Sequence, residues 1–573
     1  MQVESFLELS ARQWPDKTAL VCGDRRVTYA ELEQTANRLA HGLIAEGVGR
    51  GDRVAVHLEN SVEAVVAVLA ILKAGAVFMM VNPTTKAEKL AYVLNNSRAR
   101  AIVLPEGKVP VLETCWAETP HLKLVILTRS ADATKRRASP SAIGAQKKNA
   151  TCRLAADGTS AERNACVAAP ATAKRCAISF LRVNKRPDHN PLRQDGCIYL
   201  EELLQRHAHD TQPPRKRAID IDLAALIYTS GSTGNPKGVI LTHLNMVAAA
   251  TSITTYLENT PDDVILNVLP LSFDYGLYQV LMGLKVGGTV VLERSFAYPQ
   301  AVLQKLIEEK VTGFPLVPTM SAILLQMDLR KYDFPHLRYV TNTGAALPTE
   351  HIVRLRRLFP KVKIYSMYGL TECKRVSYLP PDQIDARPGS VGKGMPNEEV
   401  YLVDDDGRRL GPGVVGQLVV RGSNVMKGYW ELPEETDRVL RPGPLPGEKV
   451  LYTGDLFRMD EEGYLYFVGR KDDIIKSRGE KVSPKEVENV LYAHPEIAEA
   501  AVVGVPDEIL GQAIKAVVSR KNGSRLTEQD VLRHCARRLE DFMVPQSVEF
   551  RAVLPKTGNG KIDKRGLTGG ASV

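Results

Sequence analysis

The sequence has little of what marks a disulfide-rich or zinc-binding protein. It contains eight cysteines in 573 residues, and no two of them form a Cys-x-x-Cys pair. No histidine lies at a zinc-finger spacing from them. These absences argue against a zinc module and a disulfide framework, so we predict scattered, reduced thiols. The cysteines are Cys22, Cys115, Cys152, Cys166, Cys176, Cys197, Cys373 and Cys535.

Long apolar runs are also lacking. The first residues, MQVESFLELSARQW, have no basic start followed by an apolar block. They predict an amphipathic helix with Phe6, Leu7 and Leu9 on one side, in place of a secretory signal. Lys73 and Gly75 interrupt the most apolar stretch, which makes it a poor membrane span and favours a buried helix followed by a buried strand. We therefore predict a soluble, cytoplasmic protein without a membrane span.

The excess of positive charge is confined to one segment. Between residues 129 and 195 there are 14 basic and 5 acidic residues, which accounts for the whole net charge of +9. The rest of the chain is neutral, so no nucleic-acid partner is predicted. Residues 129–196 lack a lasting apolar period and predict a disordered surface insertion. Two alternatives stay open: an out-of-frame or strain-specific stretch, and a docking segment for an acidic partner.

The remaining sequence is typical of a large globular protein with more than one domain. Hydrophobic residues make up 44% and charged residues 25%, and 573 residues exceed what one hydrophobic core holds. Residues 1–128 and 221–470 alternate helical and strand patterns, which indicates a largely parallel α/β sheet. The tail after residue 470 reads as a small α+β domain of about one hundred residues. We therefore predict domains at 1–470 and 471–573.

The strongest local signal is the string YTSGSTGNPKG at residues 228–238, between two predicted strands. Small residues let the backbone approach an anion closely, and hydroxyl groups donate to phosphate oxygens. A Walker loop has a glycine, any four residues and then Gly-Lys-Ser or Gly-Lys-Thr. Counted from Gly231, the second glycine is replaced by Pro236, so this is not a standard P-loop. The candidate nucleotide-binding residues here are Thr229, Ser230, Gly231, Ser232, Thr233, Gly234 and Lys237.

With this string and others in the same order along the chain, from TYAELEQTANRLA to PKTGNGKIDKR, the sequence resembles the AMP-forming adenylating superfamily. That superfamily includes acyl-CoA synthetases, non-ribosomal adenylation domains and luciferases. The resemblance covers nearly everything except residues 129–196. It implies an α/β fold: two doubly wound α/β subdomains and a distorted β-barrel form the large domain, and a mobile α+β domain follows. It also implies ATP, Mg²⁺ and CoA as reactants or cofactors.

The resemblance implies roles for two further nucleotide motifs. In YGLTE, Tyr368 would stack on adenine, Thr371 would touch the α-phosphate and Glu372 would hold Mg²⁺, which prefers carboxylate oxygen together with substrate phosphates. In YTGD, Asp455 would accept hydrogen bonds from both ribose hydroxyls, assisted by Arg470. Further residues expected to lie along the nucleotide are Gly344, Ala345, Ala346 and Gly369.

The C-terminal motifs imply a second half-reaction. Asp472 matches the position of a hinge, where the small domain pivots. Lys561, in the string PKTGNGKIDKR, matches the catalytic lysine that stabilises charge as carboxylate attacks the α-phosphate. Gly479 would line a tunnel for the pantetheine thiol. The implied activity is formation of acyl-AMP followed by transfer of the acyl group to CoA.

The acid remains open at this point. The acyl-pocket segment contains Phe273, Asp274, Tyr275 and Gly276, and Asp274 can pair with the amino group of an amino acid. A neighbouring side chain or a solvated rim is the other explanation for Asp274. A fatty or aromatic acid suits the apolar residues Phe273, Tyr275, Leu277, Val317 and Met320, which can equally be core. Because no carrier domain follows, free-standing acyl-CoA ligases fit best; loading of an acyl carrier protein is the alternative.

Overall fold

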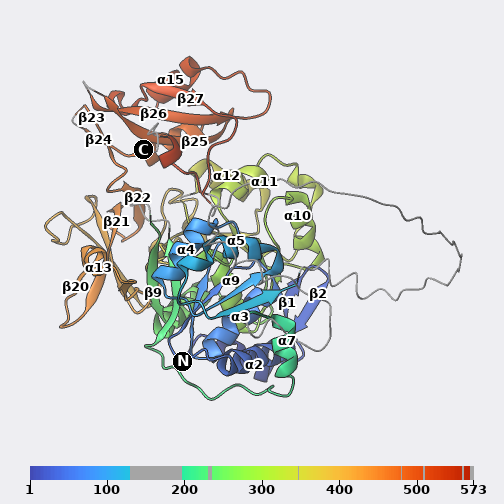
Figure 1. The fold of residues 1–573 in the computed structure, drawn as a ribbon. Helices are drawn as coiled ribbons and strands as arrows, with labels where there is room; N and C mark the ends of the chain where they lie inside the picture. Colours follow the sequence, from blue (N-terminus) through green and yellow to red (C-terminus); the bar gives the residue numbers. More distant parts are fainter. Residues whose placement is uncertain are drawn as a thin grey trace, which may run out of the picture.

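The computed structural model describes residues 1–129, 197–229, 235–345, 347–478, 480–507, 510–557 and 561–567. The insertion predicted at 129–196 lies outside these ranges, apart from its first residue. Two mainly parallel sheets with helices form the body of the molecule, and two smaller sheets follow (Figure 1). The predicted α/β fold class is therefore confirmed.

The first sheet carries the strands that end at the candidate nucleotide site. Its inner strands are buried on both faces, which is why they read as short apolar runs. In order across the sheet, the nine strands found in the described residues are β16 (Lys393–Gly394), β15 (Ser377–Tyr378), β14 (Lys363–Tyr368), β13 (Tyr339–Asn342), β12 (Gly313–Leu316), β10 (Val264–Asn267), β11 (Thr289–Leu292), β1 (Thr18–Cys22) and β2 (Arg25–Thr28).

The second sheet contains the strand that leads into the YTSGSTGNPKG string. Its eight described strands are, in order, β19 (Gly428–Tyr429), β9 (Lys237–Thr242), β8 (Leu223–Thr229), β4 (Val77–Met80), β3 (Arg53–Val56), β5 (Ala101–Pro105), β6 (Leu124–Thr128) and β7 (Cys197–Tyr199). Because β8 and β9 pair antiparallel, Thr229 lies opposite Lys237, so the two ends of the string are held next to each other.

Helices lie between and around these sheets, and their ends follow local sequence signals. In α2 (Tyr29–Ala45), Thr28 and Glu31 form a capping box. In α3 (Val62–Lys73), the side chain of Ser61 accepts the first-turn hydrogen bond, and nearly every residue is buried. The others are α1 (Ser5–Gln13), α4 (Ala87–Asn96), α5 (Val109–Cys115), α7 (Leu200–Arg206), α8 (His243–Tyr256), α9 (Asp274–Val286), α10 (Pro299–Glu308), α11 (Pro318–Leu324), α12 (Thr349–Leu358) and α13 (Pro433–Val439).

The N-terminal helix α1 is present as predicted, with one residue misplaced. Phe6 and Leu7 are buried, but Leu9 is 49% exposed. Leu9 follows Leu7 by two helical positions, a rotation of about 200° around the axis, so the two side chains cannot share one face. None of the helices in the described ranges combines the length and the apolarity that crossing a bilayer requires.

The third sheet stands where the distorted β-barrel was expected. Its strands are β17 (Glu398–Val403), β18 (Val415–Gly422), β21 (Lys449–Met459), β20 (Leu440–Pro442) and β22 (Leu465–Arg470). Among the described residues, β21 pairs with β18, β20 and β22, and β17 pairs with β18. These strand pairs form an open sheet and do not close into a ring. The expected barrel is therefore corrected to an open, antiparallel five-stranded sheet.

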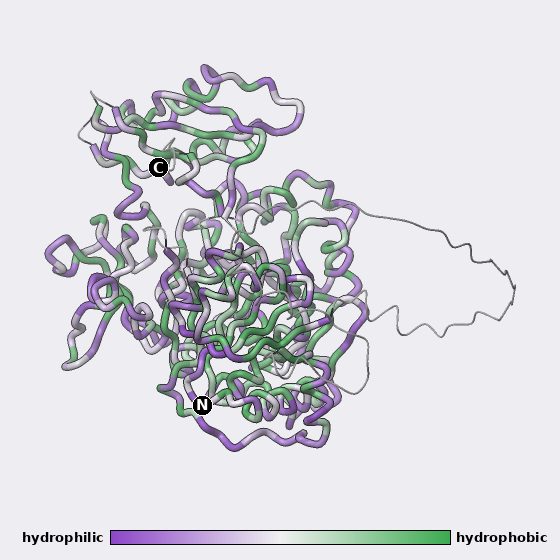
Figure 2. The backbone as a smooth tube through the Cα atoms, viewed as in Figure 1, coloured by the Kyte–Doolittle hydropathy of each residue, from purple (hydrophilic) through white to green (hydrophobic). Residues whose placement is uncertain are grey.

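The fourth sheet belongs to the C-terminal part of the chain, drawn in red in Figure 1. It consists of β24 (Glu480–Val482), β23 (Ile475–Ser477), β26 (Gly511–Arg520), β25 (Ile497–Asp507) and β27 (Ser547–Phe550), with helices α14 (Pro484–Tyr492) and α15 (Glu528–Ala536). It has a hydrophobic cluster of its own, built from residues between Ile475 and Phe550. The tube in Figure 2 likewise shows apolar residues inside this part as well as inside the body. The boundary at residue 470 stays a prediction.

Candidate active site

The candidate site forms where parallel strands of the first sheet end. Strands β10, β12, β13 and β14 run parallel, so their carboxyl ends lie at one edge. Tyr368 is the last residue of β14, and Thr371 and Glu372 follow it directly. Gly344 comes two residues after β13, and Asp274 begins α9 after β10. The topology thus brings motifs that are about a hundred residues apart to a single edge.

A carboxylate, a phenol and a guanidinium meet at the candidate ribose site. Tyr368 Oη donates to Asp455 Oδ2 at 2.5 Å, and Arg470 Nε donates to Asp455 Oδ1 at 3.1 Å. Asp455 and Arg470 lie opposite each other on β21 and β22, which fixes their approach. Burial raises the pKa of Asp455, and Arg470 and Tyr368 oppose that shift. The arrangement holds a buried acceptor in place for hydroxyl groups.

Aromatic rings surround Tyr368. Its ring centroid lies 4.8 Å from that of Phe457 in an edge contact and 6.3 Å from that of Phe467 at a smaller interplanar angle. Both phenylalanines come from the same hairpin as Asp455. The third sheet therefore supports the phenol and supplies its hydrogen-bond partner. Sequence reasoning missed these two rings because they contact Tyr368 only once the hairpin of β21 and β22 has folded next to β14.

Glu372 and Lys237 are held by residues that the sequence did not single out. Tyr429 Oη donates to Glu372 Oε1 at 2.7 Å, and the Lys237 ammonium lies 5.3 Å from the centroid of the Tyr429 ring. Lys237 Nζ also forms an ion pair with Glu435 Oε2 at 2.6 Å. Tyr429 belongs to β19, which pairs with β9 and so lies beside Lys237. The two adjacent aromatic residues in KGYW, shortly before a helix, were the signal in the sequence that could have pointed to Tyr429.

Lys561 reaches the same edge from the C-terminal part. Its Nζ lies 5.9 Å from the centroid of the Phe273 ring. Its Cε lies 3.5 Å from where a Cβ on Gly344 would stand, and Gly344 has a φ of +87°, which favours glycine. Burial lowers the pKa of Lys561, while Asp274, Asp455 and Glu372 oppose that shift. The ammonium group therefore shares a site with three carboxylates that come from the large part of the chain.

The predicted acyl-pocket residues are buried at the start of α9. Asp274 is 7% exposed and Tyr275 is 1% exposed. The Tyr275 hydroxyl and Thr341 Oγ1 are 2.6 Å apart, and the rings of Phe273 and Tyr275 meet edge to face. Gly276 is fixed by space, because a Cβ there would lie 2.5 Å from the carbonyl oxygen of Pro270. No carboxylate–cation pair within 4.0 Å is recorded for Asp274 among the described residues.

Two basic residues that sequence reasoning overlooked follow Glu372 after one intervening cysteine. Lys374 is 2% exposed and Arg375 is 4% exposed. Lys374 Nζ donates to the carbonyl oxygen of Thr371 at 3.0 Å. The backbone of this turn crosses Gly369, where a Cβ would lie 2.2 Å from the Lys374 carbonyl oxygen. This contact explains why residue 369 is glycine, and the run CKR after a nucleotide motif was the missed signal.

Several predicted residues cannot be placed in the same way. Asp472 is exposed, in the turn between β22 and β23, and Ala345 is exposed after β13. The remaining ones lie outside the described residues: Ser230, Gly231, Ser232, Thr233, Gly234, Ala346 and Gly479. Their roles stay predictions. Within the described ranges, no group of three or more histidine, cysteine or acidic side chains is positioned to hold a metal ion.

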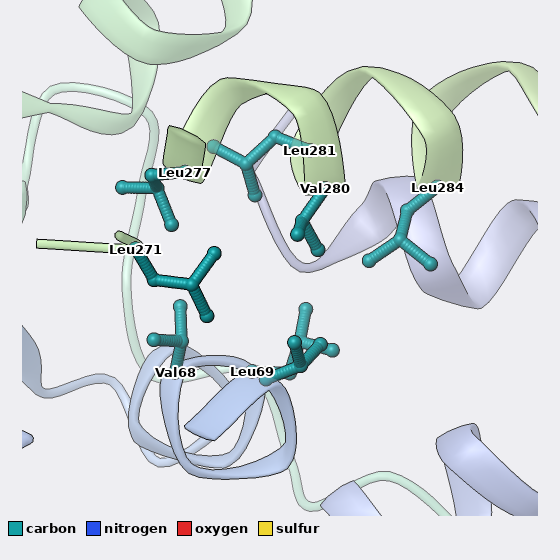
Figure 3. A pocket seen from close by; sticks show the side chains of 8 residues that line it. Val68, Leu69, Leu271, Leu277, Val280, Leu281 and Leu284 are labelled. Carbon is teal, nitrogen blue, oxygen red and sulfur yellow. The ribbon is translucent and has the colours of Figure 1, made fainter. Parts of the chain in front are cut away.

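Leu277 lies in the core and away from the residues around Lys561. It lines an apolar cavity of about 10 Å³ between α3 and α9, together with Val68, Leu271 and Leu284 (Figure 3). That volume is close to the smallest that holds one water molecule, and the walls offer no hydrogen-bond partner. Of the two explanations left open for Leu277, the core position is the one observed. Val317 and Met320 are also buried, at 4% exposure each.

We expect Leu277→Ala to destabilise the protein without changing which acid it prefers. Enlarging this cavity should lower the free energy of unfolding by about 3 kcal/mol, as for other buried leucines. Leu284→Ala, on the same cavity wall two turns further along α9, is the matched control and should behave alike. Denaturant unfolding and a competition assay between short and long acids measure the two effects. A change of acid preference in Leu277→Ala alone would place this side chain in the acid pocket.

The chain is similar to known protein families and to solved structures. The AMP-binding enzyme family matches residues 7–430, and the AMP-binding enzyme C-terminal domain matches residues 486–561. The long-chain-fatty-acid–CoA ligase of Escherichia coli O157:H7 is 32% identical, over 98% of this chain and 93% of that protein. ATP-bound MatB from Rhodopseudomonas palustris superposes with a TM-score of 0.78 at 27% identity, covering 99% and 98% of the two chains. A benzoate CoA ligase from Burkholderia xenovorans LB400 superposes with a TM-score of 0.78 at 25% sequence identity, covering 99% of this chain and 100% of that one.

The two family matches are separated by the stretch that contains β20, β21 and β22, and together they span most of the chain. The solved relatives cover it almost end to end. The arrangement of the sheets therefore belongs to a known architecture. This chain is a member of the AMP-binding enzyme family.

Proposed function

We propose that this protein is an AMP-forming acyl-CoA synthetase, which activates a carboxylic acid with ATP and transfers the acyl group to CoA. The observation that carries the proposal is the position of the Lys561 side chain, which lies against Phe273 and Gly344 at the end of the strands that also carry Tyr368. One edge of the sheet thus joins a candidate ribose acceptor, a candidate metal carboxylate and a cation. The likeness to a long-chain-fatty-acid–CoA ligase supports CoA as the thiol and makes fatty acids the first acids to test.

In the first half-reaction, a carboxylate oxygen of the acid attacks the α-phosphorus of ATP, and the bond to pyrophosphate breaks. Negative charge builds on phosphate oxygens in the transition state, and a fixed cation stabilises it. We propose that Lys561 acts there, and its contacts with Gly344 and Phe273 support this role. Asp455 and Tyr368 would orient the nucleoside so that the α-phosphate faces the acid.

The residues present fit Mg²⁺ as a partner of ATP. Mg²⁺ commonly uses one or two protein carboxylates and completes its shell with phosphates and water, so a cluster of protein ligands is not required. Glu372 is the candidate carboxylate, and the hydrogen bond from Tyr429 fixes its orientation. The ion would neutralise phosphate charge when bound. Thr371, directly before Glu372, would touch the α-phosphate.

In the second half-reaction, the CoA sulfur attacks the acyl carbon, and AMP leaves with the electrons of the broken C–O bond. Lys561 would have to withdraw for the thiol to enter, and a pivot at the exposed Asp472 permits that movement. The chain supplies the elements for this exchange: an exposed turn after β22 and a separately packed C-terminal sheet. We propose Gly479 as the residue that lines the thiol path.

The test is acid-dependent ATP–pyrophosphate exchange, followed by addition of CoA and detection of the thioester. We expect exchange with at least one class of carboxylic acid and conversion of the adenylate to acyl-CoA. A panel of fatty, aromatic, dicarboxylic and amino acids covers the classes of acid that we consider. A protein that releases no pyrophosphate with any of them would contradict the proposed function.

A second candidate is an enzyme that loads an acyl or amino-acid group onto a carrier protein. The buried Asp274, which lacks a close cation partner among the described residues, favours it, because an ammonium group of the substrate would neutralise the carboxylate. Thiol specificity separates the two candidates. Transfer to a phosphopantetheinylated carrier but not to free CoA would establish the second. Transfer to CoA, with no preference for amino acids, would leave Asp274 with a structural role.

A further inference from the structure

A buried guanidinium near the acid pocket has no acidic partner. Arg375 is 4% exposed, and its Nε has no hydrogen-bond partner. Its Nη1 donates to the neighbouring carbonyl oxygen of Lys374 at 3.3 Å, and the side chain also forms a hydrogen bond with the Tyr256 hydroxyl, so both partners are uncharged. In the part of the chain that the structure describes, no aspartate or glutamate oxygen lies within 4.0 Å of this side chain. A buried charge in this condition is costly, so its presence needs a reason.

Tyrosines, and not carboxylates, surround Arg375. Its guanidinium carbon lies 4.5 Å from the centroid of the Tyr275 ring. Burial raises the pKa of Tyr256, and the neighbouring Arg375 opposes that shift; the same holds for Tyr278. The rings shield the guanidinium from water and weakly favour its charge. They cannot neutralise it, because each of these phenols stays protonated.

Lys374 adds a second buried cation in a strained position. It is 2% exposed and has a φ of +69°, a left-handed conformation that is uncommon for lysine. Burial lowers the pKa of Lys374, and Asp274 and Glu372 oppose that shift. Strain of this kind is often retained where a side chain has to be aimed at a ligand. The turn therefore presents two consecutive cations to the interior.

The acidic groups nearby do not balance both cations. Asp274 and Glu372 both act on Lys374 and on Lys561, so neither carboxylate serves Lys374 alone. Glu372 is already hydrogen-bonded by Tyr429 and is the candidate metal ligand. Burial raises the pKa of Glu398, and Asn424 donates to it at 2.7 Å. Among the residues that the structure describes, neither Lys374 nor Arg375 has a carboxylate oxygen within 4.0 Å, so the positive charge of this pair is not in contact with an acid.

A continuous series of side chains joins this charge to the reacting centre. Lys561 Nζ lies 5.9 Å from the Phe273 ring, the Phe273 and Tyr275 ring centroids are 6.1 Å apart, and Tyr275 carries Arg375 on its face. An acid whose reacting carboxylate faces Lys561 would extend along these rings toward Arg375. We propose that Lys374 and Arg375 form a subsite for a second carboxylate, and that the substrate is a dicarboxylic acid. This rests on the proposed function.

The test compares acids of equal length with one or two carboxylates, such as hexanoate with adipate and octanoate with suberate. In ATP–pyrophosphate exchange, we expect the wild-type protein to prefer the better-fitting diacid by about 10–100-fold in kcat/KM, the worth of a charged hydrogen bond. Arg375→Gln should remove that preference and leave or raise activity with the monoacid. Arg375→Lys, which keeps the charge, should restore part of it.

Arg387→Gln is the matched control, because Arg387 also lies over a tyrosine ring but is outside the site and paired with acids. It should leave the preference unchanged. Equal loss with both acids in Arg375→Gln would make Arg375 structural and overturn the subsite. If Arg375→Gln fails to fold, the preference for diacids over monoacids in the wild-type protein and in Lys374→Met still tests the subsite. Exchange with monoacids alone overturns the subsite but supports the proposed function, whereas no exchange with any acid contradicts the proposed function itself.

Discussion

Replacing Lys561 by alanine should lower acid-dependent ATP–pyrophosphate exchange by about 10²–10³-fold, the usual effect of losing one transition-state donor. Thioester formation from supplied acyl-AMP should stay close to that of the wild type. The difference is expected because the Lys561 ammonium reaches Phe273 and Gly344, where the acid and the α-phosphate would meet. Single-turnover measurement of each half-reaction separates the two effects. Equal loss in both steps would contradict the assignment of Lys561 to adenylation.

Lys556→Ala is the matched control for this variant. Lys556 stands on the same C-terminal hairpin but forms an ion pair with Glu499 at 2.8 Å, away from the nucleotide residues. It should change neither half-reaction appreciably. The pH profile offers a second readout: burial lowers the pKa of Lys561, so adenylation should fall on the alkaline side earlier than an ordinary lysine would allow. Lys561→Arg should move that decline to higher pH.

Asp455→Asn should lower kcat/KM for ATP by about 10²-fold, because two hydrogen bonds to a charged acceptor would be lost or weakened. The assignment to ribose can be tested with 2′-deoxy-ATP. The wild-type protein should prefer ATP over the deoxy nucleotide, and the variant should have little preference left. The reason is geometric: Tyr368 and Arg470 hold the carboxylate from two sides, which leaves its remaining lone pairs for the nucleoside.

Asp460→Asn serves as the control for Asp455. Asp460 lies after β21 in the same hairpin and accepts a hydrogen bond from the backbone of Tyr464 at 2.8 Å, far from Tyr368 in the chain. It should preserve the preference for ATP. If Asp455→Asn binds ATP poorly but discriminates between the two nucleotides as well as before, Asp455 supports the fold around Tyr368 and does not read the ribose.

The sequence predicted the local elements of the first part of the chain well. Helix α2 covers most of TYAELEQTANRLA and is capped by Thr28, and β3, β5 and β6 fit the alternation of helices and strands predicted for residues 1–128. These elements are specified by periodicity and caps, which are local properties. The barrel could not be predicted correctly in the same way. Whether β17 to β22 close into a ring depends on the pairing of strands that are distant in sequence.

The site was predicted to the extent that its residues stand in motifs. Tyr368, Asp455 and Arg470 were all named, and the structure joins them by hydrogen bonds. Tyr429 and Glu435 were not, because their importance comes from β19 pairing with β9 and not from their own neighbours in sequence. Arg375 was overlooked for a different reason: a basic residue after a loop motif usually faces solvent.

The ion pair between Lys237 and Glu435 has a consequence for how nucleotide enters and leaves. A phosphate group that reaches Lys237 replaces a carboxylate already in place at 2.6 Å, so the lysine exchanges one anion for another. Such an exchange contributes only the difference between two attractions, which limits how tightly the phosphate end can be held. If Lys237 binds phosphate as proposed, Glu435 can return to the ammonium group when pyrophosphate departs. Rapid product release would follow, because the ion pair with Glu435 forms again.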